Sequence, residues 1–225
     1  MASGFRVYTN IDRSAAELAE QFKSYPTGNV ADCMNRLGAM SYEIRQFCRK
    51  GLKMSGVAIT VNARSGDNLM IHKAANMAQE GDVIVIANGM ERNRSLLGDI
   101  LVKVCKSKGV AGIVVDGPIR DLEEIYRMDF PIYATGSTPG GPFKEGPGEV
   151  NVSISCGGIC VQPGDIIYGD DDGVLVIPKE DAREILANVE VFSRQDAQKA
   201  LEAEQGRAKR EWVDILLEKK GCEII

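Results

Sequence analysis

The sequence predicts a single α/β domain followed by a C-terminal helical arm. In the middle of the chain, apolar strand-like stretches alternate with amphipathic helical ones, an order that favours parallel strands with helices packed on them. From Lys179 the pattern is helical almost to the end, where an amphipathic tail carries Trp212, the only tryptophan. With 225 residues, the chain has room for one large core or at most two small ones.

The N-terminal part predicts two helices. Ser14 and Glu17 form a capping-box pattern, which predicts a helix running from Ser14 to about Tyr25 and Pro26. A second helix is expected to follow Thr27 and to end at Gly38, because glycine commonly ends a helix.

The middle of the chain predicts alternating strands and helices. The expected strands are residues 56–63, 83–87, 112–116 and 131–135. Between them we expect a helix capped by Asp67, a helix over roughly residues 96–107, and a short helix that begins at Asp121. The second of these is expected to place its apolar residues on one face, namely Leu97, Ile100, Leu101, Val104 and Cys105.

The following part is rich in turns and short strands. Residues 136–149 are dense in Gly and Pro and predict a long loop, which in a compact domain usually serves function or packs on a partner. Short strands are then expected at residues 150–154, 158–161, 165–169 and 173–177.

Composition excludes several classes of function. The net charge of −5 argues against a nucleic-acid groove, and no run of 18 apolar residues is present that could span a membrane. The N-terminus lacks the pattern of a secretory signal, so a cytoplasmic location is expected. Neither a phosphate-binding loop nor a dinucleotide fingerprint is present, which argues against a nucleotide cofactor.

Cysteines and histidine constrain the chemistry further. The six cysteines are scattered, including a Cys156-x-x-x-Cys160 pair without a second pair, so we expect reduced, mostly buried thiols. His72 is the only histidine, which excludes a zinc site built from several histidines. Within its helix, a structural role is the commoner fate of such a residue.

Arg120 and Asp121 form the first candidate site. They follow the buried strand 112–116 and a predicted Gly-Pro turn. Asp121 could simply cap the next helix, or it could bind a hard cation such as Mg²⁺ or Mn²⁺, with Gly117 keeping the site open. Arg120 could form a weak surface ion pair, or its planar fork could hold a carboxylate or a developing enolate oxygen.

The second candidate site is the helix start at residues 95–101. Backbone N–H groups at a helix start attract anions, and Gly98 allows a ligand to come close. Asp99 is surprising beside an anion, but it suits a cation or a water on a metal. The alternative is a helix capped by Ser95 with Asp99 in its first turn. Glu123 and Glu124 add negative charge near Asp121, or simply favour the start of their own helix.

Several stretches resemble, in the same order, segments of RraA-like proteins over roughly residues 25–190. They are VADCMNRLGAM, DNLMIHKA, GDVIVI, LLGDIL, GIVVDGPIRDLEE, GPGEVNVSISCGG and PGDIIYGDDDGVLVIP. The most specific part is Gly98-Asp99, then twenty residues, then Arg120-Asp121 and an acid at Glu124. This family includes the 4-hydroxy-4-methyl-2-oxoglutarate and 4-carboxy-4-hydroxy-2-oxoadipate aldolases.

The resemblance implies a fold and an assembly. The fold would be a β/β/α swivelling-domain-like sandwich, forming one RraA-like aldolase domain over residues 1–225. Its core would cover about residues 25–190 and its helical arm about residues 179–225. The assembly would be a homotrimer or a hexamer, with sites between subunits and an acidic residue supplied by the neighbour's C-terminal region. No motif in this chain locates that residue.

The resemblance also implies roles for individual residues. Asp121 would bind the divalent metal, Mg²⁺ or Mn²⁺, with Glu124 as a possible outer neighbour of the metal. Arg120 would contact the pyruvyl oxygen, and Asp99 would bond a water on the metal. The pyruvate carboxylate would bind at the helix start, which consists of Gly98, Asp99, Ile100 and Leu101.

The activity implied is that of a metal-dependent (class II) aldolase. It would cleave 4-hydroxy-2-oxo (di)acids to pyruvate and a second oxo acid, and would decarboxylate oxaloacetate. The alternative is a non-catalytic regulator that binds ribonuclease E through protein contacts, since the family contains such a member. Fold alone does not choose between them, but the complete Arg-Asp-x-x-Glu pattern favours the enzyme.

Overall fold

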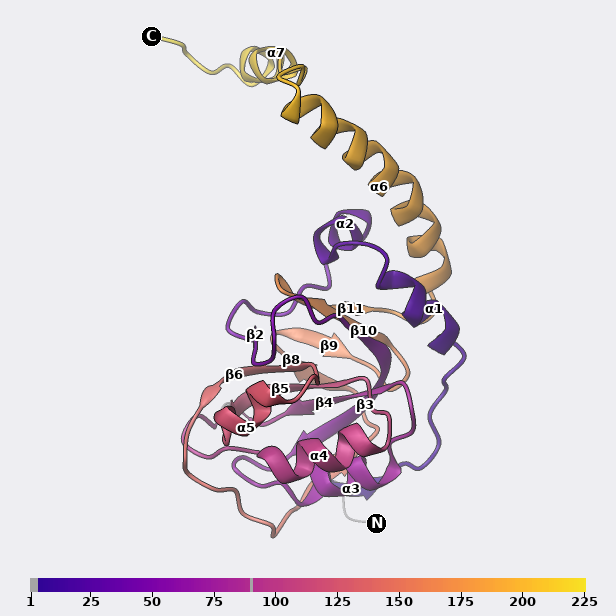
Figure 1. The fold of residues 1–225 in the computed structure, drawn as a ribbon, viewed down its shortest axis with the longest axis vertical. Helices are drawn as coiled ribbons and strands as arrows, with labels where there is room; N and C mark the ends of the chain where they lie inside the picture. Colours follow the sequence, from indigo (N-terminus) through magenta and orange to yellow (C-terminus); the bar gives the residue numbers. More distant parts are fainter. Residues whose placement is uncertain (1–3, 90) are drawn as a thin grey trace. The chain divides into compact units, whose positions relative to one another are not determined.

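The computed structural model describes residues 4–89 and 91–225, which contain seven helices and eleven strands. The chain divides into two compact units, one reaching Val189 and the other running from Glu190 to Ile225. The first unit holds both sheets (Figure 1).

A mixed sheet forms the centre of the first unit. Four neighbouring strands in it are parallel, namely β3 (Met54–Ala63), β4 (Asp82–Ala87), β5 (Gly112–Ile119) and β6 (Ile132–Ser137). The sheet is extended at its two ends by β7 (Gly148–Val150), β1 (Phe5–Val7) and β2 (Arg45–Gln46). A hairpin of β10 (Ile166–Asp170) and β11 (Gly173–Ile177) pairs with the first half of β3. A separate small sheet consists of β8 (Ile154–Cys156) and β9 (Ile159–Val161).

Apolar layers cover both faces of the central sheet. On one face lie α3 (Leu69–Met77), α4 (Asp99–Ser107) and α5 (Leu122–Arg127), which Figure 1 shows grouped together. The small sheet covers the other face. Because β4 is sandwiched between these layers, all six of its residues are buried, as expected for a parallel strand covered on both faces. The α/β architecture predicted from the sequence is confirmed.

A third apolar cluster holds the N-terminal helices. Both α1 (Ala16–Phe22) and α2 (Thr27–Cys33) pack with β10, β11 and the first turns of α6 (Ala182–Glu204). In the second unit, α6 continues and α7 (Trp212–Lys219) follows, and no residue of α7 is buried. Among the described helices, none is both long and apolar enough to cross a membrane.

Both N-terminal helices are shorter than the sequence predicts. The first begins at Ala16 without a side-chain cap, because the backbone N–H of Ser14 instead donates to the Asp12 carboxylate at 2.9 Å. The second ends at Cys33 rather than at Gly38, since Asn35 and Arg36 have positive φ angles that no right-handed helix allows.

The predicted turn after residue 116 is also wrong. Strand β5 continues through it to Ile119, with an irregularity in its pairing to β6 between Val115 and Pro118. A strand tolerates proline at such a break in the ladder. The missing side chain of Gly117 faces Asn88 inside the domain, so this glycine does not hold the candidate site open.

Other boundaries moved for similar local reasons. The predicted strand 150–154 is interrupted, because β7 ends at Val150 and Asn151 turns with a positive φ before β8 begins. Strands β1 and β2, of three and two residues, were not predicted, since so few residues carry no period. The cysteines are free thiols, as expected, but only three are buried, namely Cys48, Cys105 and Cys156.

The apolar face predicted for α4 was placed one stripe away from the true one. The helix begins at Asp99 and buries Leu101, Val102 and Cys105. In contrast, Ile100 is 75% exposed and Val104 is 41% exposed. Val102, which the sequence pattern left out, belongs to the buried stripe. Leu101, Val102 and Cys105 stand at positions i, i+1 and i+4, which lie on one side of a helix.

Candidate active site

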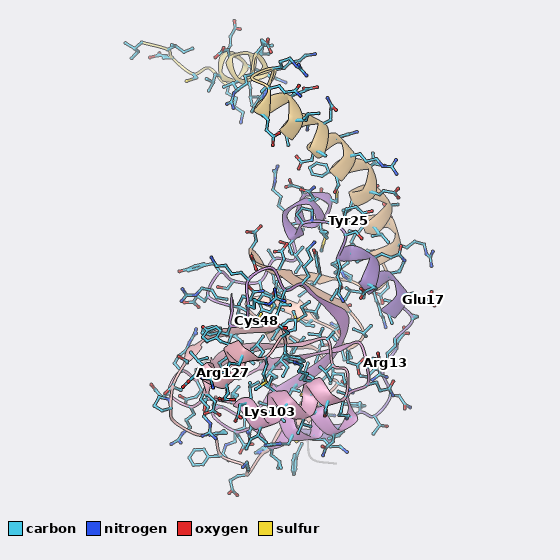
Figure 2. The ribbon with its side chains drawn as sticks, viewed as in Figure 1. Arg13, Glu17, Tyr25, Cys48, Lys103 and Arg127 are labelled. Carbon is cyan, nitrogen blue, oxygen red and sulfur yellow. The ribbon has the colours of Figure 1, made fainter. Side chains whose placement is uncertain are left out.

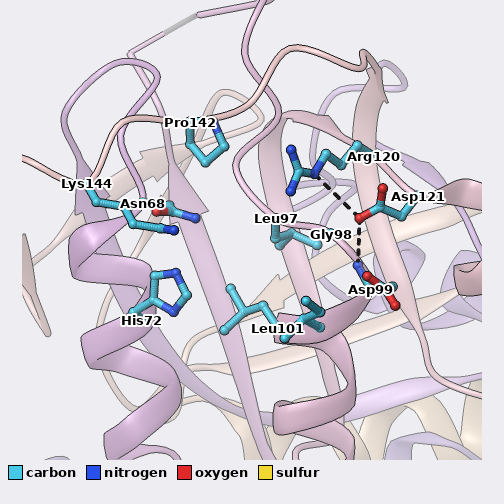
Figure 3. A pocket seen from close by; sticks show the side chains of 11 residues that line it. Asn68, His72, Leu97, Gly98, Asp99, Leu101, Arg120, Asp121, Pro142 and Lys144 are labelled. Atoms are coloured by element: carbon cyan, nitrogen blue, oxygen red, sulfur yellow. Dashed lines mark hydrogen bonds and ion pairs between the residues drawn. The ribbon is translucent and has the colours of Figure 1, made fainter.

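A cavity of about 150 Å³ lies where the starts of α3 and α4 meet the end of β5 and the loop between β6 and β7 (Figure 3). The sequence assigned seven residues to metal or substrate binding, and all of them except Glu124 line this cavity. The six that do are Gly98, Asp99, Ile100, Leu101, Arg120 and Asp121. The structure therefore brings together the two candidate sites that lie twenty residues apart in the chain.

Asp121 is held toward the start of α4. Its backbone has a left-handed conformation, with φ of 63°, and its side chain makes no capping hydrogen bond to α5. Instead, its Oδ2 accepts the N–H of Asp99 at 3.2 Å and lies 3.5 Å from Nε of Arg120 (Figure 3). Asp121 therefore occupies the N-cap position of α5, but its carboxylate does not cap that helix and lines the cavity instead.

Gly98 creates the space for this carboxylate. A Cβ atom at Gly98 would lie only 2.1 Å from Oδ2 of Asp121 and 3.2 Å from Nε of Arg120. The backbone of Gly98 is extended, with φ of −137°, so any residue could adopt it. Glycine is required here for room and not for backbone freedom.

Arg120 lies between the start of α4 and the overlying loop. Its backbone N–H donates to the carbonyl of Leu97 at 3.1 Å, which fixes the position of the residue. Its side chain is 44% exposed, so its ion pair with Asp121 contributes little stability. The guanidinium can therefore offer its planar donors to an anion in the cavity.

Asp99 carries the second acid of the cavity, and a cation neutralises it. Nζ of Lys103 lies 2.6 Å from its carboxylate, and the hydrogen bond from Lys103 lowers the pKa of Asp99. Glu124 does not line the cavity. Its carboxylate accepts a hydrogen bond from Arg127 at 2.6 Å and lies 4.0 Å from Lys103, so it reaches the site only through that lysine. Figure 2 labels Lys103 and Arg127 within the helical layer.

The opposite wall of the cavity was largely missed from the sequence. It consists of Asn68, His72 and Lys144. Asn68 is 5% exposed and donates through Nδ2 to the carbonyl of Leu96 at 3.0 Å, while its buried Oδ1 has no partner among the described residues. Because buried polar atoms are almost always paired, this acceptor suits a bound hydroxyl or water.

His72 lies on this wall rather than within the core. Partial burial and then the nearby charge of Lys144 lower the pKa of His72. The sequence signals for this wall were the stretch DNLMIHKA, which carries Asn68 and His72, and the Gly/Pro-rich segment 136–149. The latter carries Lys144 and was predicted to serve function or to pack on a partner.

The donor atoms of the cavity suit a hard cation. Within residues 4–89 and 91–225, no cluster of three or more His, Cys, Asp or Glu side chains could hold a metal. The side chains that line the cavity therefore do not fit a structural zinc site, which needs about four protein ligands. They fit Mg²⁺ or Mn²⁺, which bind through one or two carboxylates and retain several waters. Asp121 would be the direct ligand.

The fold agrees with the comparisons with known proteins. Residues 27–176 match the family model described as RraA-like, Aldolase/RraA, and the chain belongs to this family. A protein of Halalkalibacterium halodurans, provisionally named a 4-hydroxy-4-methyl-2-oxoglutarate aldolase, is 39% identical over 176 residues. That match covers 78% of this chain and 83% of the relative.

Solved structures of the same family have the same fold. The RNA-processing inhibitor RraA from Thermus thermophilis is 31% identical, with a TM-score of 0.62, covering 68% of this chain and 92% of that one. Streptomyces coelicolor RraAS2, described as an unusual member of the RNase ES inhibitor RraA protein family, is 27% identical. Its TM-score is 0.71, and the match covers 82% of this chain and 97% of that one.

Proposed function

We propose that this protein is a divalent-metal-dependent (class II) aldolase that cleaves 4-hydroxy-2-oxo (di)acids to pyruvate and a second oxo acid. The observation that carries the proposal is the convergence of Asp121, Arg120 and the start of α4 on one cavity. The absence of a side chain at Gly98 brings these groups within contact distance. The provisional aldolase name of the Halalkalibacterium halodurans relative supports the same conclusion.

Each group has a role in this reaction. The substrate carboxylate binds at the start of α4, where backbone N–H groups lack partners within the helix. Asp121 would hold Mg²⁺ or Mn²⁺, and the bound ion would supply a Lewis acid for the 2-oxo group. A general base takes the proton from the C4 hydroxyl, and the C3–C4 bond breaks with its electron pair passing into the pyruvate enolate. The second oxo acid leaves with a new carbonyl at C4, and protonation of the enolate at C3 gives pyruvate.

Arg120 faces the charge that appears in this step. Its guanidinium donates to the oxo oxygen as negative charge develops on it, and stabilisation that grows toward the transition state is what accelerates a reaction. Lys144 and Arg120 both line the cavity, beside the carboxylates of Asp99 and Asp121, so each carboxylate of a diacid substrate has one cation to pair with.

The same site should decarboxylate oxaloacetate. Oxaloacetate shares the 2-oxo acid end of the aldol substrates, and loss of CO₂ from its C3 leaves the same pyruvate enolate. A site complementary to that enolate lowers both barriers. Decarboxylation needs no proton removed from a C4 hydroxyl, so it depends on Arg120 and Asp121 but not on the general base.

We also propose that the protein acts as a homotrimer or hexamer, without nucleic-acid or membrane partners. Ile100, 75% exposed on the rim of the cavity, and Val104, one turn further along α4, present an apolar strip beside the site. Exposed apolar side chains grouped in this way are typical of subunit contacts.

The test is an activity assay across substrates and metals. Pyruvate release is measured with several 4-hydroxy-2-oxo diacids and with oxaloacetate, with and without Mg²⁺ or Mn²⁺, subtracting the rate due to free metal. Turnover that depends on the metal supports the proposal. A flat result for every acid, with folded and metal-loaded protein, refutes it.

The second candidate function is a non-catalytic regulator of RNA processing. It is favoured by the 31% identity to the Thermus thermophilis inhibitor. Inhibition of ribonuclease E by the purified protein, undiminished in Arg120→Ala and without turnover of any oxo acid, would favour it over the aldolase.

A further inference from the structure

Asp67 is a buried carboxylate that the proposed chemistry does not use. It is 1% exposed and directly precedes Asn68 of the cavity wall. Its Oδ1 accepts the N–H of Leu69 at 2.9 Å, at the start of α3. Its Oδ2 accepts two more backbone N–H groups, from Glu145 at 2.6 Å and from Gly146 at 2.9 Å.

These bonds join two segments that are far apart in the chain. Leu69 begins α3, while Glu145 and Gly146 belong to the loop between β6 and β7. Phe143 adds two backbone hydrogen bonds, donating to the carbonyl of Gly66 at 2.8 Å and accepting the N–H of Asn68 at 2.9 Å. Segment 143–146 is therefore fixed along residues 66–69.

Both joined segments carry walls of the cavity. On the α3 side are Asn68 and His72, and on the loop side is Lys144. Lys144 lies between Phe143 and Glu145, and the hydrogen bonds of these two residues hold its backbone on both sides. Its own side chain is exposed. The position of this cation in the cavity thus depends on the carboxylate of Asp67.

We propose that Asp67 is a positioning residue whose carboxylate holds segment 143–146, and with it Lys144, on the cavity. Its effect on substrate binding rests on the proposed aldolase function. Asp67 touches no substrate in this account. Burying an ionised carboxylate is costly unless it is fully hydrogen-bonded, and here three backbone donors satisfy it.

The rest of the loop has a separate anchor. Ser95 donates to the carbonyl of Gly140 through its N–H at 2.8 Å and its hydroxyl at 2.7 Å. The guanidinium of Arg94 lies over the Phe143 ring, 4.1 Å from its centroid. Gly146 has one further bond, because Arg64 donates to its carbonyl at 2.8 Å. Loss of the Asp67 carboxylate should therefore loosen residues 144–146 locally, without detaching the loop near Gly140.

Asp67→Asn tests the proposal, with Asp165→Asn as its matched control. The amide keeps the size of the side chain but replaces one acceptor oxygen by a donor. Asp165 is 4% exposed, and its carboxylate also accepts backbone N–H groups, from Gln162 at 2.8 Å and Lys179 at 3.3 Å. It does not line the cavity, so it reports the general cost of the same chemical change.

Two measurements are made on both variants. Tryptic cleavage after Lys144 should be at least about tenfold faster in Asp67→Asn than in the wild type, since losing a charge-assisted hydrogen bond shifts a local opening equilibrium by that factor or more. In Asp165→Asn it should stay at the wild-type rate. The KM for a 4-hydroxy-2-oxo diacid should rise about tenfold in Asp67→Asn, with kcat changed less than about threefold, because Lys144 contacts a part of the substrate that does not react.

Equal cleavage in the two variants would overturn the proposal, and so would faster cleavage with an unchanged KM. Hydrogen exchange of backbone amides in the wild type is a further test that needs no variant. The N–H groups of Glu145 and Gly146 should exchange at least about tenfold more slowly than unprotected amides. Exchange at the unprotected rate also overturns it. If the wild type turns over none of the oxo acids, the aldolase proposal fails, while cleavage and exchange still decide the role of Asp67.

Discussion

Replacing Gly98 by alanine should displace the Asp121 carboxylate and little else. The new Cβ would lie 2.1 Å from Oδ2 of Asp121, so the carboxylate must withdraw by about 1.3 Å to reach the 3.4 Å at which ordinary contact begins. The clash involves the end of a flexible side chain, and the extended backbone of Gly98 suits alanine. The fold should therefore survive.

The expected cost falls on catalysis. Moving a catalytic group by about 1 Å can reduce the rate about a hundredfold, which corresponds to about 2.7 kcal/mol of transition-state stabilisation. Pyruvate release gives kcat and KM, and circular dichroism melting reports the fold. Gly28→Ala is the control, because a Cβ at that helical glycine meets nothing within 4 Å.

The result that would refute this reasoning is specific. If Gly98→Ala retains activity within about tenfold of the wild type and melts at the same temperature, the Asp121 carboxylate does not need its present position. The proposed metal ligand would then be wrong. A large loss of activity in Gly28→Ala would instead mean that the assay responds to general changes in the fold.

Four further predictions follow from the same site. Asp121→Asn should abolish most activity while preserving the melting temperature, because asparagine tolerates the left-handed backbone at this position; near-normal turnover would remove Asp121 from the site. Arg120→Lys should lower kcat/KM nearly as much as Arg120→Ala, since lysine keeps the charge but lacks the planar fork. A donor to a developing oxyanion contributes about 2.7–4 kcal/mol, so a loss of less than about tenfold in the alanine variant would place Arg120 outside the chemistry. Chelation should silence the enzyme and Mg²⁺ or Mn²⁺ should restore it, because the donors are oxygen atoms; full activity after verified metal removal, or a lysine Schiff base trapped by borohydride, would contradict class II chemistry. Light scattering at micromolar concentration should report a trimer or hexamer, and a monomer would contradict a site shared between subunits.

The parallel strands of the core could be predicted from the sequence because each strand and each helix has a recognisable local pattern of apolar residues. Strands β4 and β5 are short runs of β-branched residues, and each is followed by a helix with apolar residues at helical spacing. Such patterns report burial directly, since a strand covered on both faces has no polar alternation. The order of elements then restricts the topology to parallel strands with helical crossovers.

The errors arose where contacts in space override local preference. Ser14 has the sequence context of a cap, yet its N–H finds Asp12, and the helix begins later. In α4, Gly98 occupies the N-cap position and the helix begins at Asp99. Packing on the sheet then turns Leu101, Val102 and Cys105 toward the core and leaves Ile100 exposed.

The candidate site shows the same division between local and distant information. Arg120 and Asp121 are adjacent in the chain and follow one strand, so a short motif was enough to single them out. Asn68 and Lys144 come together through hydrogen bonds between distant segments, among them those that Asp67 accepts from backbone groups 78 and 79 residues away. No local pattern encodes that contact, although Asp67 had been predicted to cap α3 and does accept the N–H of Leu69.

The two walls of the cavity should therefore respond differently to substitution. Arg120 is fixed by its place at the end of β5 and by one backbone bond to Leu97, so a change there alters the chemistry and leaves its neighbours in position. Lys144 is fixed from a distance through Asp67, so that wall can move without disturbing the groups at the reacting end. Variants of Asp67 should accordingly raise KM for 4-hydroxy-2-oxo diacids, whose second carboxylate does not react. The kcat of oxaloacetate decarboxylation should stay nearly unchanged, because that step depends on the enolate-forming end.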